Sequence, residues 1–165
     1  MAERPQARLI LMCGLPGAGK TTLALRLAEA LPAVRLCPDE WLTTLGLDLR
    51  DDRTRDRLEA VFWRHAQELL RLGQSVILES GFWLRSDRDE KRLGARALGV
   101  AVELRYLTAP LDELHRRIQA REETSGEWHG ASITRAELEQ WSPYFAAPDA
   151  DELALFDTPA PNASA

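Results

Sequence analysis

A glycine-rich segment near the start of the chain has the residue types and spacing of a phosphate-binding loop. Residues 14–22 read GLPGAGKTT, which fits the pattern G-x-x-x-x-G-K-T. Glycines let the backbone curl so that successive N–H groups point at phosphate oxygens, and a helix beginning near Lys20 adds its positive end. Lys20 would reach the outer phosphates, and the Thr21 hydroxyl would bind Mg²⁺. The residues predicted to bind the nucleotide are Gly14, Leu15, Pro16, Gly17, Ala18, Gly19, Lys20, Thr21 and Thr22.

Three classes of protein use such a loop, and they differ in the fate of the third phosphate. A GTPase switch reads guanine with an N-K-x-D loop, but the single asparagine of this chain is Asn162, so that class is excluded. An ATPase motor typically has an apolar strand that ends in Asp, whereas here VILESGF carries Glu79, and the chain is short for such a machine. A kinase needs a base, positive charge at the transferred group and an element that excludes water.

The candidate base is Asp39, in the segment CPDEW that follows a predicted strand at residues 33–37. Ligands of open α/β sheets gather at the carboxyl ends of the strands, so Asp39 is placed to take a proton from an acceptor hydroxyl. The alternative is a structural one, in which Asp39 caps a short helix at residues 40–45. Glu40 is the second candidate for the base.

Glu79 and two arginines supply the remaining kinase groups. Glu79 ends a buried strand at residues 75–79, where it would hold Mg²⁺ through a water or orient the acceptor; an ion pair with an arginine is the alternative. Arg117 and Arg121 are four residues apart on one predicted helix and therefore share a face. They precede an irregular polar segment, residues 122–133, which is the predicted lid. Solvated arginines are the alternative.

Several aromatic side chains are predicted near the acceptor end of the site. Trp41 follows Asp39, Phe82 and Trp83 follow Glu79, and Trp128 lies in the lid. An aromatic pocket suits a planar or drug-like acceptor, although any one of these residues could equally belong to the core.

The hydrophobic pattern alternates between strands and helices. Short apolar runs predict strands at residues 8–13, 33–37, 75–79 and 100–107, with one more at 153–156. Helical periodicity predicts helices between them, and capping-box spacing occurs at Ser86 with Asp89 and at Thr134 with Glu137. The prediction is an α/β fold with about five mostly parallel strands flanked by helices.

Length and composition fit one domain. The chain has 165 residues, with a predicted N-terminal arm at 1–7, a P-loop domain at 8–158 and a disordered tail at 159–165. The net charge of −5 disfavours a broad nucleic-acid surface. No apolar segment approaches the length of a membrane span, and Cys13 and Cys37 are expected to be buried free thiols, so a cytoplasmic location is expected.

On these residues the chain resembles a family of small P-loop kinases, which includes polynucleotide 5′-hydroxyl kinases, zeta toxins and chloramphenicol phosphotransferase. It is most similar to the compact AAA-domain kinase-like proteins. The resemblance covers roughly residues 8–158 and depends on GLPGAGKTT, PDEW, VILESGFW and LHRRIQAR.

The resemblance implies a nucleoside-kinase-like fold, ATP and Mg²⁺ as cofactors, Asp39 as general base, and Arg117 or Arg121 as the lid arginine. Polynucleotide kinases also carry an arginine shortly after the catalytic Asp, but this chain has Trp41 and Leu42 there. The expected activity is therefore transfer of the γ-phosphoryl group of ATP to a hydroxyl of a small acceptor. A polynucleotide or toxin-like nucleotide-sugar kinase, and an ATP-binding regulatory module, are the alternatives.

Overall fold

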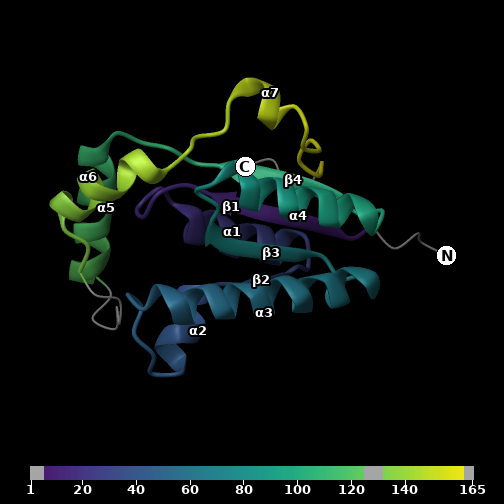
Figure 1. Cartoon of the computed structure of the whole chain (residues 1–165), viewed down its shortest axis with the longest axis horizontal. Coiled ribbons are helices and arrows are strands. Elements are labelled where there is room, and N and C mark those ends of the chain that lie inside the picture. The colour runs from purple at the N-terminus through teal and green to yellow at the C-terminus, as the bar shows by residue number, and fades with distance from the viewer. Residues whose placement is uncertain (1–5, 125–131, 162–165) are drawn as a thin grey trace.

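The computed structural model describes residues 6–124 and 132–161 and shows a parallel sheet between two layers of helices (Figure 1). The strands are β1 (Arg8–Cys13), β2 (Val34–Leu36), β3 (Val76–Gly81) and β4 (Ala101–Tyr106). Their order in the sheet is β2-β3-β1-β4, and every neighbouring pair is parallel. The two central strands, β1 and β3, thus end side by side, and the loops that follow them meet at one edge.

The alternation of side chains along β1 assigns the helices to the two faces of the sheet. Leu9, Leu11 and Cys13 pack against α3 (Asp52–Arg71) and α4 (Arg85–Ala97). Ile10 and Met12 point the other way, toward α1 (Lys20–Ala30). Successive side chains of a strand face opposite sides of the sheet, so both faces of β1 are buried and its sequence is continuously apolar from Leu9 to Cys13.

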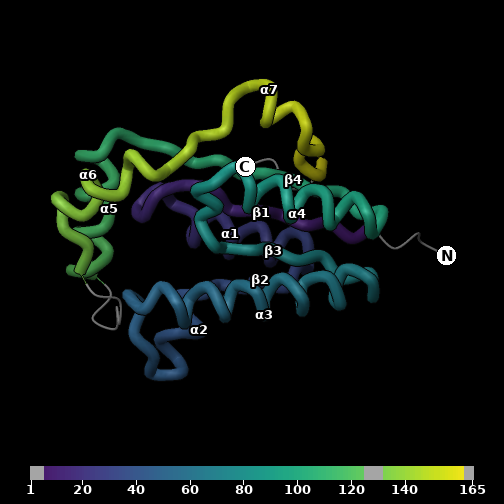
Figure 2. Tube along the Cα trace, in the orientation of Figure 1, coloured from purple at the N-terminus to yellow at the C-terminus, as the bar shows by residue number. Residues whose placement is uncertain are grey.

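The remaining helices lie at the carboxyl edge of the sheet and along its flank. α2 (Pro38–Thr44) follows β2 directly, while α5 (Leu111–Thr124) and α6 (Arg135–Trp141) pack together beside the phosphate-binding loop (Figure 1). A 3₁₀ turn, η1 (Ser142–Tyr144), and α7 (Ala150–Leu153) complete the described elements. The tube in Figure 2 shows how the segment after α6 returns across α4. None of the helices in these ranges has the length and apolar character that a membrane span requires.

The structure differs from the predicted elements in three places. The predicted strand at residues 153–156 is wrong: α7 and a turn occupy this segment, so the sheet has four strands among the residues described. α7 forms because the Asp149 side chain accepts a hydrogen bond from the Glu152 N–H. Ser86 does not cap α4, whose N-cap is Leu84. The capping box of Thr134 with Glu137 is confirmed, but α6 ends at Trp141 because Ser142 and Pro143 continue as the 3₁₀ turn.

Candidate active site

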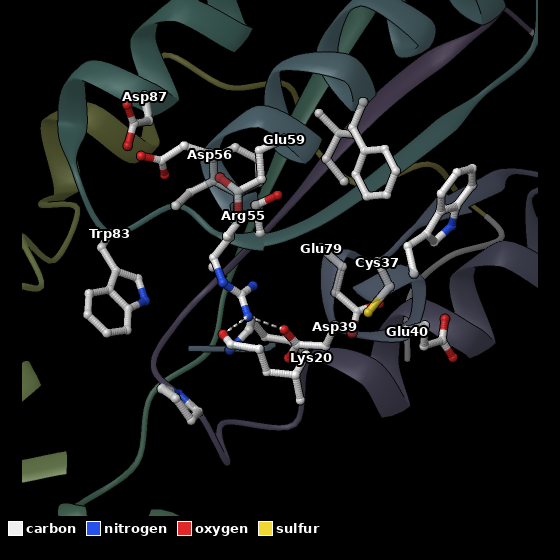
Figure 3. A pocket seen from close by; sticks show the side chains of 18 of the residues that line it. Lys20, Cys37, Asp39, Glu40, Arg55, Asp56, Glu59, Glu79, Trp83 and Asp87 are labelled. Atoms are coloured by element: carbon white, nitrogen blue, oxygen red, sulfur yellow. Dashed lines mark hydrogen bonds and ion pairs between the residues drawn. The ribbon is translucent and has the colours of Figure 1, made fainter. Parts of the chain in front are cut away.

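One large cavity lies at the carboxyl edge of the sheet. It has a volume of about 1820 Å³ and is bounded by the phosphate-binding loop, α2, the first half of α3, the end of β3 and the start of α4. Figure 3 shows its interior, in which Lys20, Asp39 and Glu79 lie close together. Of the residues predicted as site residues, the cavity is lined by Pro16, Gly17, Gly19, Lys20, Thr21, Asp39, Glu40, Trp41, Glu79, Phe82, Trp83 and Arg121.

The phosphate-binding loop connects β1 to α1 and curls tightly. Gly17 has φ +82°, a backbone conformation that L side chains rarely adopt, and a Cβ there would come 2.5 Å from the backbone carbonyl oxygen of Leu114 in α5. Gly19, with φ +96°, is the N-cap of α1. The glycines therefore allow both the curl of the loop and its close contact with α5.

Lys20 folds back onto this loop. Its Nζ donates hydrogen bonds to the carbonyl oxygens of Gly14 (2.9 Å) and Leu15 (2.8 Å). Burial lowers the pKa of Lys20 to about 8, and the negative charges of Glu79 and Asp39 partly oppose this effect. The ammonium group thus lies within the electrostatic field of both candidate carboxylates.

Thr21 and Glu79, the two predicted Mg²⁺ ligands, contact each other directly. The Thr21 hydroxyl donates to Oε1 of Glu79, and Arg35 on β2 donates from Nη1 to Oε2 of Glu79 at 2.7 Å. The same guanidinium reaches Oε2 of Glu40 in α2. The Glu79 side chain is only 3 % exposed, so its charge is stabilised by these two donors. Glu79 therefore pairs with an arginine and at the same time contacts Thr21.

Asp39 lies in the first turn of α2 and faces the cavity. Its Oδ1 accepts a hydrogen bond from Nη2 of Arg55 at 2.6 Å, and the same nitrogen donates to the carbonyl oxygen of Leu49 at 3.2 Å. The alternative interpretation, in which Asp39 caps a helix at residues 40–45, is wrong, because α2 begins at Pro38 with Cys37 as its N-cap, so Asp39 lies inside the first turn. The structure adds that its carboxylate is half exposed and held by an arginine of α3.

The two arginines of α5 have different surroundings. Arg121 lines the cavity, and burial lowers its pKa below the usual arginine value against the opposing charges of Asp39, Glu122 and Glu79. Arg117 is not among the described residues that line the cavity; its Nε donates to Oε1 of Glu113 at 2.9 Å, on an exposed part of the helix. Of the two candidate lid arginines, the structure therefore places Arg121 at the cavity and Arg117 away from it.

Part of the predicted lid lies outside the described residues. Helix α5 continues to Thr124, and residues 125–131, which include Trp128, are not described. Ile133, after this gap, lines the cavity together with Arg121.

The aromatic residues form two groups along the cavity. Trp41 makes an edge-to-face contact with Phe62 of α3, with ring centroids 5.0 Å apart. Trp83 packs against Trp141 and Phe145 of the segment that follows α5. Part of the Trp41 ring and part of the Trp83 ring thus pack against other aromatic side chains. Both residues still border the cavity, as does the buried Phe82.

Carboxylates line the end of the cavity away from the phosphate-binding loop. Asp56 and Glu59 of α3 lie near Asp87 of α4 (Figure 3). Burial raises the pKa of Glu59 to about 7; Arg55 and Lys91 oppose the shift, and the charges of Asp56 and Asp87 add to it. The end of the cavity beside the phosphate-binding loop therefore carries both signs of charge, and the far end, called here the acidic end, carries these three carboxylates with Lys91 nearby.

A buried ion pair supports the loop that carries Phe82 and Trp83. Arg88 of α4 donates from Nε and Nη2 to the two carboxylate oxygens of Glu152 at 2.6 and 2.9 Å, and from Nη1 to the carbonyl oxygen of Phe82 at 2.9 Å. The side chains of Arg88 and Glu152 are 1 % and 2 % exposed. This arrangement joins the C-terminal segment to the wall of the cavity at Phe82, a residue with an unusual φ of +48°.

Sequence reasoning missed Arg35, Arg55, Glu59 and Arg88. Arg55 and Glu59 belong to the polar face of an amphipathic helix, which ordinarily faces solvent, and no local spacing distinguishes them from their neighbours. A charged residue in the short strand β2, as Arg35 is, would have been a usable signal.

Comparisons with known proteins show the family and the fold of the chain. The family described as "AAA domain" matches residues 9–148. A presumed kinase of Chloroflexus aurantiacus j-10-fl shares 27 % identity and a TM-score of 0.66, over 81 % of this chain and 77 % of that one. The Pnkp1/Rnl/Hen1 RNA repair complex gives 20 % identity and a TM-score of 0.69, over 87 % of this chain and 45 % of the other. The Mycobacterium tuberculosis APS kinase CysC, solved with AMPPNP and APS, gives 21 % and 0.54, over 78 % and 80 %.

No curated protein matches the chain in sequence. The structural likenesses confirm the predicted fold, that of the P-loop kinases. Because the family match extends over most of the 165 residues, the chain belongs to the AAA domain family.

Proposed function

We propose that the protein is an ATP-dependent kinase that transfers the γ-phosphoryl group to a hydroxyl of a small acceptor. The observation that carries the proposal is the position of the Asp39 carboxylate, which faces the same cavity as Lys20 and the Thr21–Glu79 pair. A group that removes the hydroxyl proton must lie near the phosphate-binding loop, and the position of the Asp39 carboxylate in the same cavity supports this role for it.

The chemistry follows from these groups. The loop amides and Lys20 bind the phosphates and neutralise charge that develops during transfer. Asp39 accepts the proton of the acceptor hydroxyl through its carboxylate, whose Oδ1 is already held by Arg55. A P–O bond forms to the acceptor oxygen while the bond between the β,γ-bridging oxygen and the γ-phosphorus breaks, and ADP leaves with that bridging oxygen. Arg121, which also lines the cavity, would stabilise the transferring group.

Thr21 and Glu79 fit a magnesium ion bound together with nucleotide phosphates. Mg²⁺ prefers oxygen ligands and is usually held by one or two carboxylates plus substrate phosphates, not by a full protein cage. Bound there, the ion would neutralise charge on the phosphate oxygens.

The cavity favours a small acceptor over a polynucleotide. Asp56, Glu59 and Asp87 line its far end, where a phosphate backbone would meet negative charge. The similarity to an RNA repair complex concerns the fold, and it does not outweigh this charge pattern. The acidic end is compatible with an acceptor rich in hydroxyl groups or carrying an amine.

The test is ADP release from Mg·ATP across a panel of hydroxyl acceptors, with mass spectrometry of the products. The panel includes sugars, amino sugars, nucleosides, antibiotics and short 5′-hydroxyl oligonucleotides. We expect one class to gain the mass of one phosphoryl group. Asp39→Asn is expected to keep ATP binding and to lower transfer at least about a hundredfold, which is within the usual contribution of a general base.

Asp48→Asn is the matched control, because Asp48 is an exposed aspartate near α2 that does not belong to the described lining of the cavity. Undiminished transfer by Asp39→Asn would remove Asp39 from the role of base. Slow ADP release with every acceptor unchanged would contradict the kinase proposal and favour an ATP-dependent binding module.

A further inference from the structure

Arg55 contacts the proposed base directly. It lies in the second turn of α3, and its Nη2 joins Oδ1 of Asp39 (2.6 Å) to the carbonyl oxygen of Leu49 (3.2 Å). These two bonds connect three separate segments: the first turn of α2, the loop between α2 and α3, and α3 itself. Figure 3 shows the guanidinium inside the cavity, beside Lys20.

The N-cap of α3 fixes the position of Arg55. Asp51 caps α3 by accepting hydrogen bonds from the Thr54 N–H at 3.2 Å and from the Thr54 hydroxyl at 2.6 Å. The cap fixes the direction in which the helix starts, and hence the side from which Arg55 enters the cavity. The Arg55 side chain is 27 % exposed, so it is partly shielded from water.

A general base needs a fixed direction as well as a charge. An aspartate carboxylate that is half exposed can rotate about its side-chain bonds, and rotation would remove its free oxygen from the acceptor. Arg55 holds Oδ1 and leaves Oδ2 for the hydroxyl. We propose that Arg55 is a positioning residue of the transfer step, which acts by orienting the Asp39 carboxylate toward the acceptor.

This inference rests on the proposed function. The competing explanation is an ordinary partly exposed ion pair, which would contribute little to stability and nothing to turnover. The two explanations differ in kinetics, because a positioning residue acts through Asp39 and has no effect once the Asp39 carboxylate is gone.

The experiment is a double-mutant cycle on the full chain, with Mg·ATP as substrate and water as the acceptor, measured as ADP release. The same cycle is repeated with any hydroxyl acceptor that the panel identifies. Arg55→Gln is expected to lower kcat about tenfold with KM for ATP unchanged within twofold, since part of the general-base contribution is lost. Arg55→Lys, which keeps a donor and the charge, should recover part of the rate. In the Asp39→Asn background, Arg55→Gln should have no further effect.

Arg57→Gln is the control, because Arg57 is an exposed arginine of the same helix and is not among the described residues lining the cavity. Circular dichroism tests whether each variant is folded. If Arg55→Gln does not fold, Arg55→Lys replaces it in the double-mutant cycle. Losses that multiply fully in the double variant, or an unchanged kcat in both Arg55 variants, would overturn the positioning role while leaving the kinase proposal intact. No ADP release from the unsubstituted chain with water or with any acceptor of the panel, or an unchanged rate of phosphoryl transfer in Asp39→Asn, would instead overturn the proposed function and this inference with it.

Discussion

The buried pair of Arg88 and Glu152 allows a quantitative prediction about stability. Both side chains are at most 2 % exposed, and two hydrogen bonds of 2.6 and 2.9 Å join them. Glu152→Gln keeps the shape but removes the negative charge, which leaves the guanidinium buried without a counter-charge. Removing one partner of a buried ion pair costs about 3–5 kcal/mol. For a domain of this size we expect a fall in Tm of about 10 °C, at about 2–4 °C per kcal/mol.

The double variant Arg88→Met with Glu152→Leu tests the cause. It removes both charges, so we expect it to recover most of the loss, apart from about 1–3 kcal/mol for the Phe82 carbonyl oxygen that Arg88 no longer satisfies. The assay is urea unfolding followed by circular dichroism. Glu139→Gln, which breaks the exposed pair with Arg135, is the control and should cost less than about 1 kcal/mol. A loss below about 1 kcal/mol in Glu152→Gln would refute the reasoning, as would a double variant less stable than the single one.

Two further predictions concern the cavity. The pKa of Glu59 is raised from 4.5 to about 7, so the folded state holds this proton more tightly and the free energy of unfolding should fall as pH rises from about 4.5 to 7. Glu59→Gln removes that slope. The free energy of unfolding of the variant minus that of the unsubstituted chain should be about 1–3 kcal/mol larger at pH 8 than at pH 4, as measured by urea unfolding. This range is below the value for the full pKa shift because the carboxyl borders an open cavity. An equal difference at both pH values would count against it. Gly17→Ala brings a Cβ 2.5 Å from the Leu114 carbonyl oxygen and should weaken ADP binding at least about tenfold by calorimetry, since the loop must shift. Gly99→Ala, with a similar φ of +70° and nothing within 4 Å of the added Cβ, should leave ADP binding unchanged; equal losses would remove the steric argument.

The phosphate-binding loop and the fold class could be predicted from the sequence because their signals are local. Nine consecutive residues define the loop, and the apolar runs that become β1 and β3 are continuous in the chain. The parallel α/β arrangement then follows from the alternation of strands and helices, with few topologies left to consider.

The residues that the prediction missed depend on contacts distant in sequence. Arg88 meets Glu152 across 64 residues, and neither shows a local pattern that announces burial. Arg55 and Arg57 are both arginines on the polar side of α3, yet only Arg55 faces the cavity. That difference depends on how α3 packs on the sheet, which the helical pattern fixes only to within part of a turn.

The wrong strand at residues 153–156 had a readable counter-signal. Asp149 followed by acidic residues at 151 and 152 is a typical helix start, with a capping side chain and negative charge in the first turn. The apolar residues at 153–156, which predict a strand, are a weaker signal than this cap. For Ser86 the opposite occurred: the spacing was present, but α4 begins one residue earlier, so the serine hydroxyl is already inside the helix.

Arg35 connects two carboxylates that lie in different parts of the cavity. One guanidinium on the edge strand β2 serves Glu79, beside the phosphate-binding loop, and Glu40, beside Asp39. A cation that draws charge from Glu79 also changes how firmly Arg35 holds Glu40, and a ligand that moves Glu40 changes Arg35 at Glu79. We therefore expect ligand binding in the two halves of the cavity to be coupled, and thermodynamic linkage acts equally in both directions. The edge strand β2, which is only three residues long, thus carries the one side chain, Arg35, through which we expect this coupling to act.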